Sequence, residues 1–103
     1  MGQYKVDFET MTWDTRMNGL RFKASQQGGK RLRLVEYTKD MEPHWCEKGR
    51  IGYILEGRFE IRFETELETF LPGDGVFIPP GKEHKHMGKA LTDIVRVVFV
   101  EDI

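Results

Sequence analysis

All three histidines and the only cysteine of the chain lie in two short segments. The first segment carries His44 and Cys46, and the second carries His84 and His86. One residue separates the members of each pair, so in an extended chain they share a face, about 6.6 Å apart along the strand. Imidazole nitrogen and thiolate sulfur bind zinc at ~2.0–2.3 Å. If the two strands are neighbours, these four side chains are predicted to form a metal site.

Arg50 follows the first segment and brings a fixed positive charge close to the predicted metal site. In a dry site this charge would oppose a divalent ion by several kcal/mol, as an order of magnitude. Two alternatives follow. Arg50 turns outward to pair with Glu47 or another acid and leaves the metal undisturbed. Otherwise Arg50 occupies the pocket and recruits an anionic ligand, such as a carboxylate or phosphate, which matches its planar guanidinium.

The segments that must position these residues are short and rich in alternating apolar side chains. Residues 58–64 alternate apolar and charged side chains without interruption, as in a half-buried strand. Residues 11–17 are ambiguous and could form a turn of helix. Strands are expected over residues 4–8, 20–24, 31–38, 51–55, 58–64, 76–78 and 94–100. Many short strands with regular turn signals predict an all-β sandwich or barrel.

Glycine and proline mark the predicted turns between these strands. Gly57 is expected to close a two-residue hairpin that joins residues 51–55 to residues 58–64. Residues 79–81 (Pro-Pro-Gly) predict a rigid corner that would preorganise His84 in a pocket. The basic run 30–33 is interpreted as a solvated strand face.

Strand spacing also predicts which aromatic side chains fill the core. The phenylalanines expected there are Phe59, Phe63, Phe77 and Phe99.

Length and charge exclude several classes of protein. The 103 residues are enough for one domain spanning the chain. The net charge of -1 argues against nucleic-acid binding and against docking to an anionic membrane. No apolar run approaches the ~20 residues of a membrane span. The single cysteine cannot form an internal disulfide and fits a reducing compartment, so we expect a cytoplasmic protein.

Residues 73–88 resemble the second of two short sequence motifs that define the cupin superfamily. Gly73, Pro79, Gly81 and His84 fill the glycine, proline, glycine and histidine positions of this motif, with every spacing met. The resemblance implies a double-stranded β-helix (jelly-roll) barrel of the small cupin-2 type, with a pocket in its mouth.

Residues 44–57 resemble the first cupin motif, with two departures. His44 and Gly57 fill its first and last positions, whereas Cys46 replaces its second histidine and Arg50 replaces its glutamate. In many cupins these positions hold a divalent metal through three histidines and a glutamate. Here the resemblance carries over only His44 and His84. With Cys46 and His86 as replacements, zinc or iron is the expected metal, if one is bound.

The function expected from the sequence is binding of a divalent transition metal, with a small polar or acidic molecule as substrate or signal. The alternative is a metal-free sensory or binding module in which Arg50 holds an anion. The sequence does not decide whether the protein is an enzyme, and Glu47 is the nearest carboxylate that could act as a general base. The resemblance also implies a homodimer, which would cover an edge strand such as residues 4–8.

Overall fold

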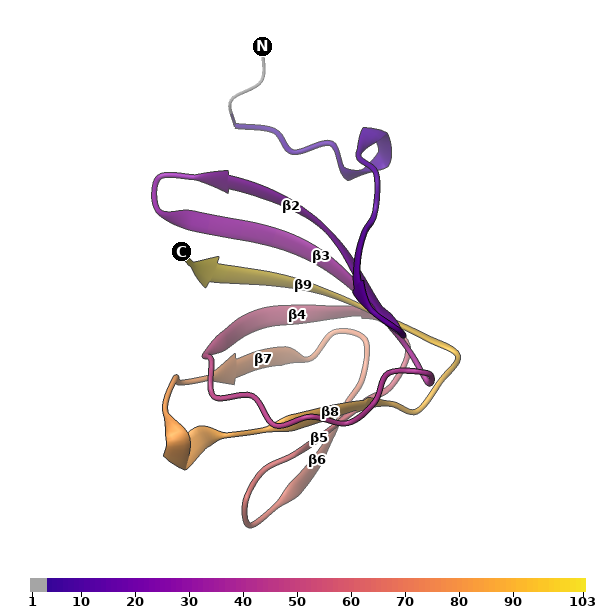
Figure 1. Ribbon diagram of the computed structural model, residues 1–103, viewed down its shortest axis with the longest axis vertical. Helices are drawn as coiled ribbons and strands as arrows, with labels where there is room; N and C mark the ends of the chain where they lie inside the picture. Colours follow the sequence, from indigo (N-terminus) through magenta and orange to yellow (C-terminus); the bar gives the residue numbers. More distant parts are fainter. Residues whose placement is uncertain (1–3) are drawn as a thin grey trace.

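The computed structural model describes residues 4–103, and its fold is all-β, with two antiparallel sheets. The larger sheet has the strand order β1-β2-β3-β9-β4-β7, and the smaller sheet has the order β6-β5-β8 (Figure 1). The strands are β1 (Asp14–Met17), β2 (Leu20–Gln27), β3 (Lys30–Thr38), β4 (Arg50–Glu56), β5 (Phe59–Arg62), β6 (Leu67–Phe70), β7 (Gly75–Ile78), β8 (Met87–Ala90) and β9 (Ile94–Asp102).

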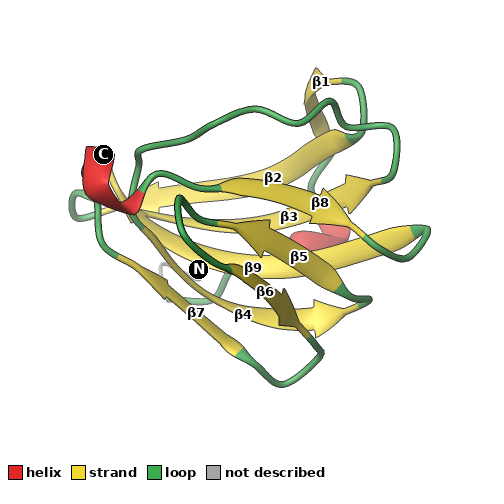
Figure 2. Ribbon diagram, turned by 90° about the horizontal axis from the view of Figure 1, so that it is seen from below, coloured by secondary structure: helices red, strands yellow, loops and turns green. Residues whose placement is uncertain are grey.

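The two sheets face each other and enclose the core, with the smaller sheet in front of the larger one in Figure 2. This arrangement is the predicted jelly-roll barrel. Side chains from both sheets meet between them, because alternate residues of each strand point to the same side. The buried apolar side chains are Phe22, Val35, Tyr37, Ile54, Phe59, Ile61, Val76, Ile78, Ala90, Val95, Val97 and Phe99.

Strands β3 and β9 pair along their whole length. The row of inward-pointing side chains on each strand includes a charged residue. On β3 the inward row of Val35 and Tyr37 extends to Arg33, and on β9 the row through Phe99 extends to Glu101. Arg33 and Glu101 are both buried. The interpretation of residues 30–33 as a solvated face is therefore wrong for Arg33, which points between the sheets.

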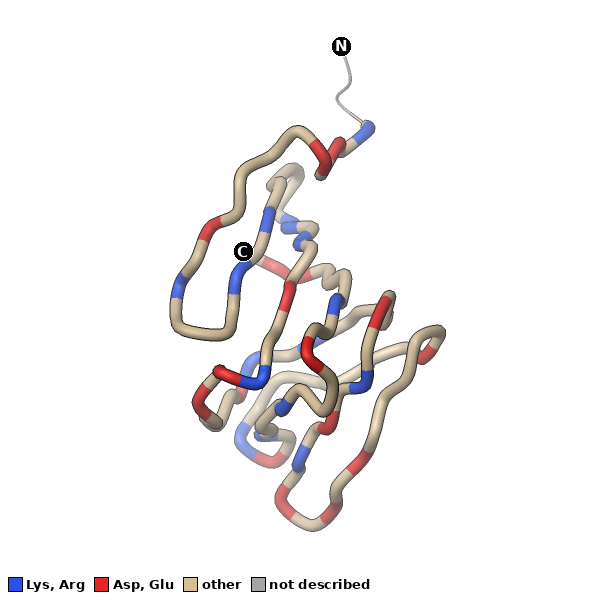
Figure 3. The backbone as a smooth tube through the Cα atoms, turned by 90° about the vertical axis from the view of Figure 1, so that its right-hand side faces the viewer, with Lys and Arg blue, Asp and Glu red and all other residues tan. Residues whose placement is uncertain are grey.

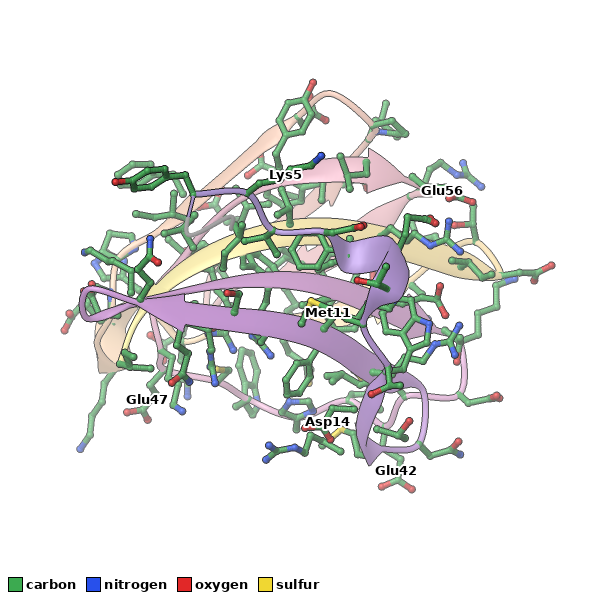
Figure 4. All side chains as sticks on the ribbon, turned by 90° about the horizontal axis from the view of Figure 1, so that it is seen from above. Lys5, Met11, Asp14, Glu42, Glu47 and Glu56 are labelled. Atoms are coloured by element: carbon green, nitrogen blue, oxygen red, sulfur yellow. The ribbon has the colours of Figure 1, made fainter. Side chains whose placement is uncertain are left out.

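The N-terminal segment is not the strand predicted for residues 4–8. Residues 5–7 have no regular structure, and Phe8–Thr10 form a short 3-10 helix, η1. The segment packs against the outward side of the larger sheet, where Lys23 Nζ donates to the carbonyl oxygen of Phe8 at 2.7 Å. Figure 4 shows this segment, with Lys5 and Met11 labelled, crossing over the sheet. It is not an edge strand that a dimer would need to cover.

Gly57 has the positive φ expected of its turn, at 82°, but the turn does not close a hairpin. Strand β4 pairs with β7 and β9, whereas β5 pairs with β6 and β8. The chain therefore crosses from one sheet to the other at Gly57. A Cβ atom at this position would lie 2.2 Å from the carbonyl oxygen of Ile94, so the crossing requires glycine.

Two further differences concern the smaller sheet and β7. Strands β6 and β8 were not predicted, and residues 11–17 contribute strand β1 rather than a helical turn. Phe77 is 78% exposed, because Val76 and Ile78 occupy the inward positions of β7. Its placement in the core was wrong.

Charged residues are dispersed over the surface. Figure 3 shows basic and acidic residues interspersed along the described chain. Among the described residues, no helix has the length and apolar character needed to cross a membrane.

Candidate functional site

A cavity of about 80 Å³ lies between the two sheets and receives side chains from both of them. Its wall combines an apolar portion with a polar group of arginine, histidine and cysteine. The lining residues are Leu20, Arg33, Tyr37, Met41, His44, Cys46, Arg50, Phe59, Ile61, Val76, Ile78, His86, Gly88 and Phe99.

Cys46 and His86 are held side by side at this cavity by their backbones. The amide of Cys46 donates to the carbonyl oxygen of His86 at 2.8 Å, and the amide of His86 donates back at 2.9 Å. The ring of His86 is buried, and its Nδ1–H donates to the carbonyl oxygen of His84 at 3.0 Å. This bond leaves Nε2 of His86 for the thiol of Cys46.

The thiol of Cys46 is acidified by its surroundings. The hydrogen bond between the thiol and His86 lowers the pKa of Cys46 from the ordinary value of 9.0 to about 7, assisted by the Lys48 backbone and the charge of Arg50, against the opposing effect of burial. A large fraction of the thiol is therefore ionised near neutral pH.

The other two histidines are placed differently. His44 lines the cavity, but it is exposed, and its Nδ1 donates to the carbonyl oxygen of Glu42 at 3.2 Å. His84 lies on the 3-10 helix η2 (Lys82–His84), where its side chain is 42% exposed and does not line the cavity. The corner before η2 thus positions His84 to orient His86 through its carbonyl oxygen rather than to present its own ring.

Arg50 occupies the cavity and at the same time pairs with an acid. Its Nη2 donates to Sγ of Cys46 at 3.5 Å, and its Nη1 donates to Oε2 of Glu101 at 3.2 Å. The guanidinium also lies 5.7 Å from the centre of the Phe99 ring. Glu47 is exposed and lies at the periphery in Figure 4, so it neither pairs with Arg50 nor reaches the cavity as a base.

Glu101 joins Arg50 to two arginines of β3 that sequence reasoning did not place at the site. Arg33 Nη2 lies 2.5 Å from Oε2 of Glu101, and Arg31 Nη2 lies 2.8 Å from Oε1. Burial alone would raise the pKa of Glu101, but the hydrogen bonds and charges of these arginines outweigh it and hold that pKa below its ordinary value. Three guanidiniums against one carboxylate leave a formal surplus of two positive charges.

Arg33 has a fully buried nitrogen, Nε, without a hydrogen-bond partner. The residue is only 8% exposed, and its Nε is the one buried side-chain nitrogen or oxygen in residues 4–103 that has no hydrogen bond. Leaving such a donor unsatisfied costs about 1–3 kcal/mol. A clue to Arg33 and Glu101 was present in the sequence, because both keep the inward spacing of their strands.

The side chains at the cavity do not fit a metal ion. Only His44, Cys46 and His86 of the four predicted ligands line it, and the guanidinium of Arg50 contacts the sulfur that would bind the ion. Within the described part of the chain, no three His, Cys, Asp or Glu side chains are grouped as metal ligands. Buried cations are compatible with an anion in this position instead.

Comparison with known proteins identifies the family. The model of the family described as Cupin domain matches residues 33–101. The chain belongs to the cupin family. The match covers every residue that lines the cavity except Leu20.

Solved structures with the same fold cover nearly the whole chain. KdgF from Halomonas sp. is 25% identical, with a TM-score of 0.71 over 92% of this chain and 89% of that one. A RmlC-like cupin from Shewanella frigidimarina is 16% identical, with a TM-score of 0.73 over 96% and 91% of the two chains.

The EutQ protein of Clostridium difficile is 14% identical, with a TM-score of 0.72 over 95% of this cupin and 85% of that chain. The search of curated proteins finds no significant match. The similarities to the RmlC-like cupin and to EutQ establish the fold only, so the ligand must be argued from the site.

Proposed function

We propose that this cupin binds a small anionic molecule in its barrel pocket, without a bound metal, through the guanidinium of Arg50. The observation that carries the proposal is the position of Arg50 itself. Arg50 stands where the first cupin motif has a glutamate. It lines the cavity and contacts Sγ of Cys46. A guanidinium cannot lose its proton at physiological pH, so the pocket keeps its positive charge.

The predicted metal site of His44, Cys46, His84 and His86, with zinc or iron, is the alternative that an experiment must separate from anion binding. A divalent ion at Cys46 would face the fixed charge of Arg50, which contacts Sγ of Cys46. Arg33, which is buried, adds a second positive charge to the cavity lining. The electrostatics of the pocket therefore favour a negative ligand.

Metal content and anion binding together test this proposal. The purified protein, incubated with zinc, iron or manganese and then desalted, should carry far less than one equivalent of metal. The chelator-treated protein should be stabilised against heat by small anions such as acetate or phosphate. Arg50→Gln should remove this stabilisation, whereas Lys48→Gln, at an exposed neighbouring position, should keep it. A full equivalent of tightly held metal in the wild-type protein would overturn the proposal.

Arg50→Glu offers a complementary test, because it restores the carboxylate of the family motif. This variant removes the cation that contacts Cys46 and adds a metal-binding oxygen. We expect it to bind zinc more tightly than the wild-type protein. Unchanged zinc affinity would show that Arg50 does not control the metal preference of the pocket.

We also propose that two copies pair through an outer patch on the larger sheet. The patch consists of Ile51, Tyr53, Phe77 and Val100, all of them large apolar side chains that are exposed. Ile51 lies directly opposite both Phe77 and Val100 in the register, so the patch is continuous across β7, β4 and β9. A second copy could cover it with the same surface.

The reducing cytoplasm is the compartment we propose, because the single cysteine lies in the site.

A further inference from the structure

We infer that Arg33 is a second anion-contacting residue of the pocket and that the ligand is a short-chain carboxylate with a small apolar body. This inference rests on the proposed anion-binding function and specifies the chemistry of its ligand. It is carried by the unpartnered Nε of Arg33 and by the apolar wall, which the proposal for Arg50 does not use.

Arg33 is held by Glu101, and its fully buried Nε–H has no partner. Its Nη2 is bound to Oε2 of Glu101, and its guanidinium lies 5.0 Å from the centre of the Phe22 ring. Its Nε has no hydrogen bond, although the residue is only 8% exposed and lines the cavity. Buried donors nearly always have a partner, so this free N–H indicates a ligand atom that completes the site.

Arg33 and Arg50 are positioned to act together. Both donate to the same oxygen, Oε2 of Glu101, at 2.5 and 3.2 Å, so their guanidiniums lie side by side. A carboxylate has two oxygens and can accept hydrogen bonds from two such donors. Glu101 thus acts as a positioning residue that holds the two cations without neutralising both.

The size and lining of the cavity define the rest of the ligand. A water needs about 10–15 Å³ of such volume, so a cavity of about 80 Å³ accepts only a molecule of a few heavy atoms. Beyond the polar group, its wall is apolar and includes Phe59, Ile61, Val76 and Phe99. A short alkyl chain would gain from contact with this wall, whereas a fully oxygenated anion would not.

Calorimetric titration of the chelator-treated protein with sodium acetate, propionate, butyrate and phosphate tests the inference. Propionate and butyrate should bind more tightly than acetate and phosphate. Arg33→Lys keeps the charge but lacks the Nε–H, and it should weaken propionate binding on the order of tenfold. Arg31→Lys is the matched control: Arg31 also pairs with Glu101 but does not line the cavity, so affinity should stay within about twofold.

The outcomes separate this inference from the proposal beneath it. If phosphate binds and the carboxylates do not, the anion site stands and the assigned ligand class is wrong. If Arg33→Lys folds, as judged by its circular dichroism, and binds propionate like the wild-type protein, Arg33 is not a contact. If no anion binds while zinc binds tightly, the proposed function itself fails.

Discussion

At the scale of single residues, the ring of His86 controls the chemistry of Cys46. His86→Ala removes the hydrogen bond that contributes most to lowering the thiol pKa, so that pKa should rise from about 7 toward the ordinary value of 9.0. The ultraviolet absorbance of the thiolate, followed against pH, measures this change in pKa. His84→Ala is the matched control, because its ring does not line the cavity and the transition should stay near 7. A similar shift in both variants would contradict the assignment.

Glu101 holds the buried arginines, and its removal should be costly. Glu101→Gln leaves Arg33 and Arg50 without their shared charge and is expected to destabilise the fold by about 3–5 kcal/mol in urea unfolding. Asp102→Asn, which breaks the exposed pair with Lys30, should cost less than about 1 kcal/mol. Equal losses in the two variants would mean that the cluster around Glu101 stabilises the fold no more than a surface ion pair does.

The pH dependence of this contribution has a definite sign. The folded-state pKa of Glu101 lies below its ordinary value of 4.5, so its contribution is fully present above that value and is lost as the pH falls through the depressed pKa. The wild-type protein should therefore lose more stability than Glu101→Gln when the pH falls below 4.5. The same unfolding experiment, repeated along the pH scale, measures the difference.

The sequence allowed part of the site to be predicted at this scale. Cys46 and His86 meet because they lie on two short segments that fold side by side, which was the condition set for the predicted site. Arg33 and Glu101 could not be placed in the same way. A charged residue at an alternating position normally marks the solvent face, and only pairing between β3 and β9 brings these opposite charges together inside the barrel.

At the scale of elements, the crossing between the sheets depends on Gly57. Gly57→Ala places a Cβ atom 2.2 Å from a backbone carbonyl oxygen at a residue with φ of 82°. We expect a loss on the order of 4 kcal/mol in urea unfolding. Gly28 also has a positive φ, but a Cβ atom there would meet no atom within 4 Å. Gly28→Ala should therefore cost only about 1–2 kcal/mol. Equal losses would show that the crossing tolerates a side chain.

The same glycine explains why the predicted hairpin was wrong. A Gly after an acidic residue, between a mostly apolar segment and an alternating one, is typical of a hairpin, and its positive φ was foreseen. Whether the next strand folds back on the same sheet depends on distant partners, and β9 and β7 already occupy both edges of β4. Local pattern therefore predicted the turn but not the pairing.

At the scale of the whole molecule, the outer patch predicts self-association. Phe77→Asp places a charge at the most exposed side chain of this apolar surface and should convert a dimer to a monomer in sedimentation experiments at micromolar concentration. Leu67→Asp, at an exposed apolar position of the other sheet, should leave the dimer intact. A wild-type protein that sediments only as a monomer would contradict the proposed pairing.

The most direct test of the account is to observe the side-chain Nε–H signals of the arginines by nuclear magnetic resonance while propionate is added to the chelator-treated protein. Arg33 has a buried Nε without a hydrogen bond, whereas Arg16 has its Nε bound to Asp14 on the surface at 3.2 Å. We predict that the Arg33 signal shifts with saturation and that the Arg16 signal does not move. An unmoved Arg33 signal, together with His86 ring signals that shift on addition of zinc, would contradict the account.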